Sequence, residues 1–341
     1  MKVSVLYDVW EEEPAPPEAP PAKPRKGKPR PRRRHPKLDR EQVFDALGKL
    51  GHEPFYQMLD GTDATLVSVV RGGADLTFNL TESYAGDDTC DMNIAAFLDL
   101  LGRAYTGAGP HALYLAQDKA LAKKIFQFHG IKTPVFALSY KGKLPHAHDI
   151  GFPLIVKPTS EDGSIGIDCG SVVSTVKELM ARIEYIQERF DTPALIEEYI
   201  EGRELYVGIL GNGRPTALPP VELDLSQLPE GMPKIAGTEV KWETDTEAYK
   251  KTKASIAGDL DEDTIGRLQE TALAAYEALE LRDYGRIDMR LRKDGEVFVI
   301  EANPNPWLAA NAEFAMAARE SGRSYTQLIG EIVDLARARA A

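Results

Sequence analysis

The hydrophobic pattern in the first third of the chain predicts a small α/β domain. Short apolar runs bounded by polar residues are typical of buried strands, and apolar residues three and four apart are typical of helices. The expected elements are a strand at residues 3–7, a helix at 41–50, strands at 65–70 and 75–80, and a helix at 93–101. This order predicts a parallel sheet with helices packed on it, ending near residue 106.

Beyond residue 106 the order of elements changes and predicts an α+β arrangement. Apolar spacing indicates long helices there, separated by strand-like runs. The expected helices lie at residues 113–129, 176–189, 264–280 and 324–339, and the expected strands lie at 135–139, 152–157, 167–173, 194–199 and 204–210. No internal repeat is evident.

A β-hairpin predicted in the last third of the chain places two acids face to face. If residues 294–295 form a two-residue turn, the numbers of opposed residues have a constant sum. Asp288 then lies opposite Glu301, and Arg286 lies opposite Asn303. Because side chains alternate between the faces of a strand, these four share one face. The other face should bury Ile287, Met289, Leu291, Phe298 and Ile300.

The opposed acids of this hairpin form a candidate cation site. Two carboxylates directly opposed across a strand pair repel each other. A hard cation such as magnesium, or manganese in its place, would remove that repulsion, and the Asn303 amide oxygen is a suitable third ligand. The alternative is an exposed hairpin face that carries unrelated charges.

Composition and charge narrow the class of protein. The chain has 341 residues, of which 43% are hydrophobic and 28% are charged, so two or three globular domains are expected. No apolar run approaches the roughly 18 residues that cross a bilayer, and no signal peptide is expected. Cys90 and Cys169 are too few for a disulfide framework, which makes a cytoplasmic location the expectation.

Residues 11–36 interrupt the first domain with a segment rich in Pro, Lys, Arg and Ala. It has little to bury, which predicts a loop inserted after the first strand. Residues 19–38 contain nine Lys or Arg and no acid, so the rest of the chain carries −12 minus 9, or −21. An acidic body disfavours nucleic acid as the main partner. The basic arm at residues 23–37 could contact an acidic partner, and a solvated insertion without a ligand is the alternative.

Two lysines are candidates for binding phosphate. Lys157 ends an apolar strand and precedes a loop, residues 158–166, that is rich in Gly and hydroxyl residues. Backbone N–H groups in such loops can surround phosphate oxygens, with lysine as a point charge. Lys119 lies near the start of a predicted helix. The alternatives are an ordinary surface turn and a solvated helix lysine.

The strand at residues 194–199 ends in acids that are costly to bury without hydrogen-bond partners. Glu197 could accept a hydrogen bond from an adenine amino group, and Glu204 could accept from ribose hydroxyls. The alternative is an edge strand with polar ends.

Together these residues resemble the ATP-grasp superfamily, and within it the D-alanine:D-alanine ligase branch. The resemblance covers residue 78 to the C-terminus. Each motif is common by itself, but the ordered set is specific. It comprises Asn79-Leu-Thr-Glu82, Tyr105-Thr-Gly-Ala-Gly109, Asp118-Lys119, Gly130-Ile-Lys-Thr-Pro134, Phe152-Pro-Leu-Ile-Val-Lys157, Glu197-Glu-Tyr-Ile-Glu-Gly-Arg-Glu204, Lys241-Trp242, Gly285-Arg-Ile-Asp288 and Glu301-Ala-Asn303.

The resemblance implies a three-domain ATP-grasp fold, combining α/β and α+β parts. A Rossmann-like domain at residues 1–106 precedes two subdomains, at residues 107–201 and 202–341, that clamp ATP. The implied activity is that of a carboxylate–amine ligase. ATP phosphorylates a carboxylate, an amine displaces phosphate, and an amide forms. A homodimer through the first domain is also implied.

The roles implied by the resemblance are specific to each residue. Arg286 and Lys241 resemble catalytic residues, Arg286 facing the acyl phosphate and the oxyanion. Asp288, Glu301 and Asn303 resemble the magnesium ligands. The residues that resemble ATP-binding positions are Lys119, Lys157, Glu161, Gly163, Ser164, Gly166, Glu197, Glu198, Ile200 and Glu204.

The substrate end departs from the family pattern. The Gly-Gly-x-Ser-x-Glu turn expected after the first strand is replaced by Asp8 and the residues up to the insertion, and the histidine expected near residue 80 is missing. Trp307 replaces a small residue. We expect Glu82, Trp307 and Asn311 to contact substrates other than two D-alanines. A true D-alanine:D-alanine ligase, a non-catalytic ATP-binding module and a scaffold acting through the basic arm are the alternatives.

Overall fold

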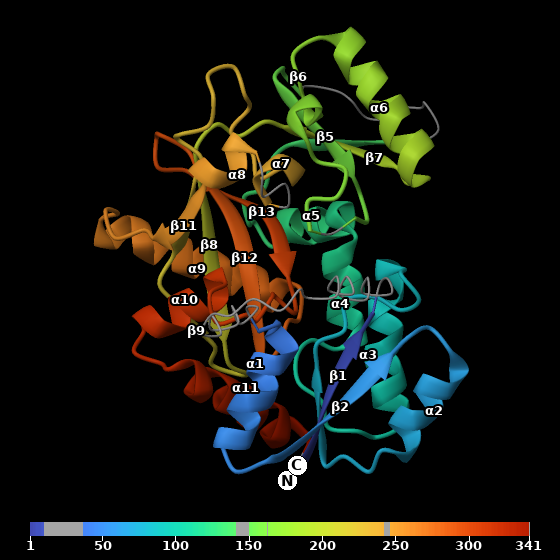
Figure 1. The fold of residues 1–341 in the computed structure, drawn as a ribbon. Coiled ribbons are helices and arrows are strands. Elements are labelled where there is room, and N and C mark those ends of the chain that lie inside the picture. Colours follow the sequence, from blue (N-terminus) through green and yellow to red (C-terminus); the bar gives the residue numbers. More distant parts are fainter. Residues whose placement is uncertain (10–36, 141–149, 162, 242–245, 341) are drawn as a thin grey trace, which may run out of the picture.

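The computed structural model describes residues 1–9, 37–140, 150–161, 163–241 and 246–340 (Figure 1). The predicted insertion at residues 11–36 lies outside them, as does all of the basic arm except Lys37. Within the described part, the strands form one parallel sheet and two antiparallel sheets. No described helix is long and apolar enough to cross a membrane.

The parallel sheet has the strand order β2-β1-β3. Its central strand buries Val3, Val5 and Leu6 completely, which explains why the N-terminal apolar run forms a strand. The bounds of this part are β1 (Lys2–Asp8), α1 (Asp39–Lys49), β2 (Glu53–Leu59), α2 (Asp63–Arg71), β3 (Leu76–Asn79) and α3 (Asp91–Leu100).

The prediction of a buried strand at residues 65–70 is wrong, because this segment is helix α2. Its β-branched residues favour a strand locally, but Asp60 accepts hydrogen bonds from the hydroxyls of Thr62 and Thr65 at the start of the helix. Val67 and Val70 are exposed. The strand of the sheet is β2 instead, and its polar residues interrupt the apolar run that would have predicted a buried strand.

A small antiparallel sheet of order β4-β7-β5-β6 lies at the top right of Figure 1. Its inner face packs against α6 through Val156, Ile183 and Ile186. The predicted strand at residues 167–173 is wrong for most of its length, because Cys169–Ser171 form a short 3-10 helix and only β6 is extended. The bounds are β4 (Phe136–Ser139), β5 (Leu154–Pro158), β6 (Val172–Val173), α6 (Val176–Phe190) and β7 (Ala194–Glu198).

The large antiparallel sheet has the order β11-β10-β8-β12-β13, with β9 paired to β8. Helix α9 covers one face through Leu268 and Ala272, and α10 and α11 pack near the other. The bounds are β8 (Arg203–Leu210), β9 (Thr216–Ala217), β10 (Val221–Asp224), α7 (Thr238–Lys241), α8 (Glu247–Lys251), β11 (Lys253–Ile256), α9 (Glu262–Ala278), β12 (Tyr284–Leu291), β13 (Val297–Asn303), α10 (Glu313–Glu320) and α11 (Tyr325–Ala340).

Two helices, α4 (Pro110–Gln117) and α5 (Lys119–Phe128), lie between the sheets (Figure 1). The sequence predicts one continuous helix at residues 113–129, and this is wrong. Asp118 breaks it and caps α5 by accepting hydrogen bonds from the backbone N–H groups of Ala120 and Leu121. The break places Lys119 at the first residue of α5.

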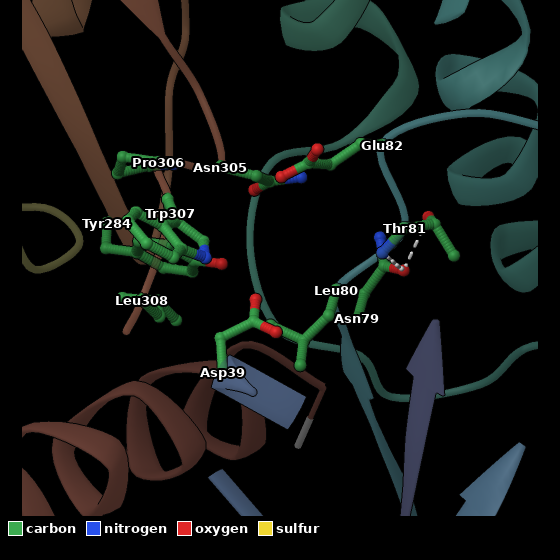
Figure 2. A pocket seen from close by; sticks show the side chains of 10 residues that line it. All are labelled: Asp39, Asn79, Leu80, Thr81, Glu82, Tyr284, Asn305, Pro306, Trp307 and Leu308. Carbon is green, nitrogen blue, oxygen red and sulfur yellow. Dashed lines mark hydrogen bonds between the residues drawn. The ribbon is translucent and has the colours of Figure 1, made fainter. Parts of the chain in front are cut away.

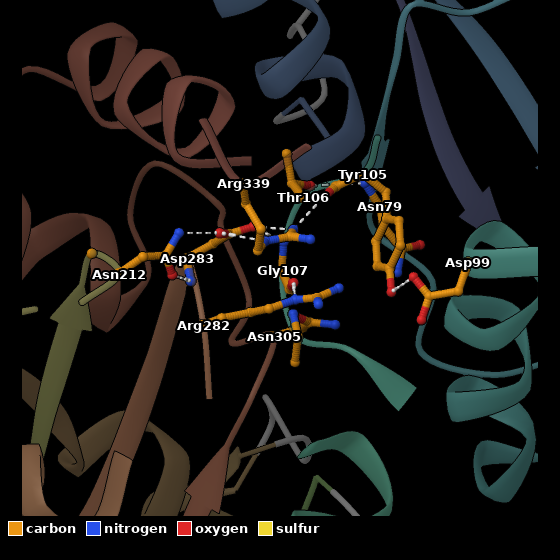
Figure 3. Close-up of polar contacts among 12 residues, drawn as sticks. Asn79, Asp99, Tyr105, Thr106, Gly107, Asn212, Arg282, Asp283, Asn305 and Arg339 are labelled. Carbon is orange, nitrogen blue, oxygen red and sulfur yellow. Dashed lines mark hydrogen bonds and ion pairs between the residues drawn. The ribbon is translucent and has the colours of Figure 1, made fainter. Parts of the chain in front are cut away.

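The parallel-sheet part is fixed to the large sheet by a buried acid, Asp283 (Figure 3). Its Oδ2 accepts a hydrogen bond of 2.9 Å from the Gly107 backbone N–H and lies 2.9 Å from Arg339. Arg339 also donates to the Tyr105 carbonyl at 2.7 Å. Nearby, the Asn305 side-chain oxygen accepts from the Ala108 backbone N–H. A Cβ on Gly107 would lie 2.3 Å from that oxygen, so this contact requires glycine.

Candidate functional site

The predicted hairpin consists of β12 and β13, and the predicted pairs are confirmed. Asp288 lies opposite Glu301, and Arg286 lies opposite Asn303. The expected two-residue turn is wrong, however, because the last pair joins Leu291 to Val297 and five residues separate them. A β-bulge between Asp288 and Met289 shifts the register by one residue and restores the predicted pairs.

The bulge also corrects the predicted apolar face. On β13, Val299 and Ala302, which lie on either side of the bulge, face the core together with Ile287. Phe298 lies opposite Arg290 instead, and Ile300 is the residue that the bulge leaves without a paired partner on β12. A hydrophobic pattern does not reveal a bulge, so sequence alone assigns Phe298 and Ile300 to the wrong face.

Arg286 and Asp288 form a bidentate ion pair. Arg286 Nε donates to Asp288 Oδ1 at 2.7 Å and Nη2 donates to Oδ2 at 2.9 Å. The guanidinium also lies 4.8 Å from the centre of the Tyr206 ring. Burial raises the pKa of Asp288, while Arg286 opposes the rise. The sequence placed both residues on one face but did not predict that they pair.

Glu301 pairs with a lysine from another element. Lys119 Nζ lies 2.6 Å from Glu301 Oε1 and donates to the Glu161 carbonyl at 2.6 Å. Burial opposes ionisation of Glu301, but Lys119 and Lys157 outweigh it and lower its pKa to about 2. Lys119 therefore connects the hairpin to the Gly-rich loop.

Asn303 completes the predicted metal set. Its Nδ2 atom is buried and has no hydrogen-bond partner among the described residues. Within the same residues, no group of three or more His, Cys, Asp or Glu is placed to hold a metal ion. The predicted set has only two acids, and its third member is this amide.

Lys157 and Glu197 are deeply buried and lie side by side. Lys157 Nζ lies 2.6 Å from Glu197 Oε2, and a second lysine, Lys123, lies 2.6 Å from Oε1. Burial opposes ionisation of Glu197, but the two lysines lower its pKa. Burial also lowers the pKa of Lys123, to about 8. Lys123 was not predicted as a site residue, although it lies one helical turn from Lys119.

The Gly-rich loop is described except for residue 162. Gly163, Ser164 and Gly166 have positive φ, which turns the backbone sharply. At Gly166 a Cβ would lie 2.6 Å from Pro158, so the loop returns over the end of β5. Arg182 donates to the Gly166 carbonyl at 2.7 Å and anchors this end. Burial raises the pKa of Glu161, whereas Lys119 lowers it.

Glu204 is held by two side chains of the large sheet. Arg290 donates to Oε2 at 2.6 Å, and the Tyr206 hydroxyl donates to Oε1 at 2.8 Å. Arg290 lies on the same face as Arg286 and Asp288, two residues further along β12, a spacing that could have predicted its place.

The other predicted nucleotide positions lie at the end of β7. The Glu198 backbone N–H already donates to the Val135 carbonyl at 2.9 Å. Ile200 is buried. Lys241 ends α7, and its charge opposes the rise in the pKa of Asp288 that burial causes and contributes to the low pKa of Glu301.

Two of the three predicted substrate residues line one pocket, shown in Figure 2. Glu82 and Trp307 lie on opposite sides of it, whereas Asn311 is exposed and does not line it. Asp8 accepts hydrogen bonds from the Glu82 backbone N–H and the Ser83 hydroxyl, which fixes the Glu82 loop. The lining comprises Asp39, Asn79, Leu80, Thr81, Glu82, Tyr284, Asn305, Pro306, Trp307 and Leu308.

The chain is similar to known proteins. A family model described as the D-ala D-ala ligase C-terminus matches residues 125–334. The chain is 33% identical to the D-alanine--D-alanine ligase of Bordetella petrii over 279 residues, covering 81% of this chain and 80% of that protein. The chain belongs to the D-alanine–D-alanine ligase family. It is therefore an ATP-dependent ligase.

Two further proteins are similar to this chain. The uncharacterized protein y4sG of Sinorhizobium fredii is 30% identical over 307 residues, covering 88% of this chain and 87% of that protein. A D-alanine–D-alanine ligase structure from Bacillus anthracis, complexed with ATP, has a TM-score of 0.72 at 22% identity and covers 100% of this chain and 98% of its own. The ATP-grasp fold implied by the resemblance is confirmed.

Proposed function

We propose that the protein is a carboxylate–amine ligase that forms an amide through an acyl phosphate. One observation carries the proposal: Lys119 contacts both Glu301 on the hairpin and the Glu161 carbonyl of the Gly-rich loop. It thereby joins the predicted metal strand to the predicted phosphate loop, which are far apart in sequence.

ATP would lie between the two antiparallel sheets. Lys119, Lys157 and Lys241 would neutralise its phosphates, and the loop from Glu161 to Gly166 would cover them. Glu197 would accept from the adenine amino group, with the backbone of Glu198 and Ile200 beside the base. Glu204, which Arg290 and Tyr206 orient, would accept from the ribose hydroxyls.

The hairpin residues fit a hard divalent cation. Asp288, Glu301 and Asn303 offer only oxygen ligands from one face. Among the described residues the Asn303 side-chain nitrogen has no hydrogen-bond partner, so turning the amide oxygen toward the cation would break no hydrogen bond of that nitrogen. When bound, magnesium would neutralise charge on the transferred phosphoryl group.

Arg286 would act at the bond that forms. A substrate carboxylate oxygen attacks the γ-phosphorus, and ADP leaves. The amine then attacks the carbonyl carbon, the carbon–oxygen bond to phosphate breaks, and the amine loses a proton. Arg286 would stabilise the intermediate oxyanion, and its bidentate contact with Asp288 orients it.

The pocket beside Trp307 is the candidate substrate end. Asp39 and Glu82 offer acceptors for a substrate ammonium group, while Leu80, Pro306 and Leu308 offer apolar contact. From this chemistry we infer an amino acid or small peptide as substrate, and the cavity, of about 10 Å³, would have to widen to admit it. D-alanine is the first compound to test because relatives bear that name, and the changed turn after β1 supports a different amine or acid.

The test is phosphate release from ATP and magnesium with amino acids and small carboxylates supplied in pairs. Release that depends on one pair, with an amide formed, supports a ligase. Nucleotide binding without turnover for any pair would support a non-catalytic module instead.

Assembly and location also belong to the proposal. We infer a homodimer through the parallel-sheet part and a cytoplasmic location. Sedimentation equilibrium tests the first, since a monomer at micromolar concentration would contradict it.

A further inference from the structure

Lys123 is a buried cation for which the proposed reaction has no role. It projects from α5 one turn after Lys119 and is 1% exposed. Burying an ammonium group is costly unless it is paired and hydrogen-bonded. The groups that pair with the Lys123 ammonium therefore indicate its role.

Three oxygens from three parts of the chain surround the Lys123 ammonium. They are Glu197 Oε1 at 2.6 Å, Thr133 Oγ1 at 3.0 Å and the Ile300 carbonyl at 3.1 Å. Lys123 donates hydrogen bonds to the Thr133 and Ile300 oxygens, and its contact with Glu197 Oε1 is an ion pair whose geometry is not that of a hydrogen bond. Helix α5 lies beside β13 in Figure 1, so Lys123 reaches the Ile300 carbonyl directly.

Two of these oxygens, those of Ile300 and Glu197, belong to elements of the proposed site. Ile300 is the bulge residue, and the bulge sets the register that brings Glu301 opposite Asp288. Thr133 strengthens the same link, because its hydroxyl donates to the Val299 carbonyl at 2.8 Å. Lys123 thus holds the bulge in place from one side and the Glu197 carboxylate from the other.

Glu197 is shared between Lys123 and Lys157. In the proposed function Lys157 contacts an ATP phosphate, and any movement toward it weakens its contact with Glu197. A buried carboxylate that loses its only cation is strongly destabilised. A second cation on the opposite oxygen prevents that loss.

We propose that Lys123 is a positioning residue that keeps Glu197 ionised and in place, so that Lys157 is available to the nucleotide. This inference rests on the proposed function, because it assigns Lys157 and Glu197 to ATP. A merely structural lysine would stabilise the fold without any specific dependence on Glu197. The two roles make different predictions for a double variant.

The experiment measures ATP affinity by calorimetry, with magnesium present and amino acids absent, for wild type, Lys123→Met, Glu197→Gln and the double variant. We expect Lys123→Met to weaken ATP binding at least about tenfold. We expect the double variant to bind ATP within about twofold of Glu197→Gln, because the neutral amide no longer needs a cation. Lys132→Met is the control: Lys132 pairs with exposed Glu296 on the neighbouring surface, and its loss should leave affinity unchanged.

Each outcome decides the matter. Unfolding of Lys123→Met alone, with the double variant folded, supports the pairing. Unfolding of both variants, equal losses in the two backgrounds, or unchanged affinity in Lys123→Met would overturn the inference while leaving the proposed function intact. Failure of the wild-type chain to bind ATP would overturn the proposed function and the inference with it.

Discussion

The proposed nucleotide end and the proposed substrate end of the site are built differently. At the nucleotide end, buried charges from separate elements meet in pairs: Lys119 with Glu301, Lys157 with Glu197, and Arg290 with Glu204. At the substrate end, Trp307 is 52% exposed and Asn311 is a surface residue. The charges at the first end are paired within the protein, whereas the second end presents an exposed aromatic ring.

This difference predicts that members of the family retain the residues proposed to bind ATP more strictly than the residues proposed to bind the substrate. Changing one member of a buried pair leaves its partner uncompensated, so each pair resists substitution. An exposed tryptophan in a pocket has no such partner. Chains of this family can therefore share phosphate chemistry while their acid and amine differ.

The largest effect should come from the hairpin. Glu301→Gln removes a proposed metal ligand and the partner of Lys119, and we expect turnover to fall at least about a hundredfold with the fold retained. Steady-state phosphate release and circular dichroism measure the two effects. Glu296→Gln is the matched control, a glutamate of the same hairpin paired with exposed Lys132, and it should keep wild-type activity. Full activity in Glu301→Gln would contradict the assignment of Glu301 as a metal ligand.

A lysine variant should affect the nucleotide more than the amino acid. Lys157→Met removes a proposed phosphate contact but leaves Glu197 paired with Lys123, so we expect the KM for ATP to rise roughly ten- to a hundredfold. Lys124→Met, on the exposed side of α5, is the control. Unchanged ATP kinetics in Lys157→Met would remove Lys157 from the site.

The substrate end should respond in the opposite way. Trp307→Ala removes a wall of the pocket, and we expect the KM of the amino-acid substrate to change about tenfold while that for ATP stays within about twofold. Two substrate titrations at saturating partner concentrations measure this split. A change confined to ATP would place Trp307 at the wrong end.

The smallest effect concerns the pH dependence of stability. The folded pKa of Glu301, about 2, lies below its ordinary value, so between roughly pH 4.5 and 2 the unfolded chain binds more protons at this residue than the folded chain does. The resulting stabilisation is complete above that range and is lost as pH falls through it. Urea unfolding without metal or nucleotide should give Glu301→Gln a shallower loss of stability in this range. Parallel curves would contradict the assigned pairing.

The sequence predicted the parts of the site that depend on local pattern. Strand alternation placed Asp288 opposite Glu301, and glycine spacing indicated the loop. The same reasoning gave the correct pairs through a wrong turn, because the longer loop and the bulge shift the register by one residue each and cancel.

What the sequence could not predict arises from contacts between distant segments. The ion pair of Lys119 with Glu301 and the role of Lys123 depend on how α5 packs against β13. Likewise, α2 resembles a strand by composition, and only its position at the surface reveals the helix. Tertiary context overrides local preference in such segments.

The most direct test of the central claim follows the oxygen atoms of the substrate carboxylate. The acid is labelled with oxygen-18 and supplied with ATP, magnesium and the amine identified by the pairwise screen. An acyl phosphate transfers one labelled oxygen to inorganic phosphate for each amide formed. We predict that transfer in the wild-type protein and none in Glu301→Gln. Unlabelled phosphate released together with amide would contradict the mechanism.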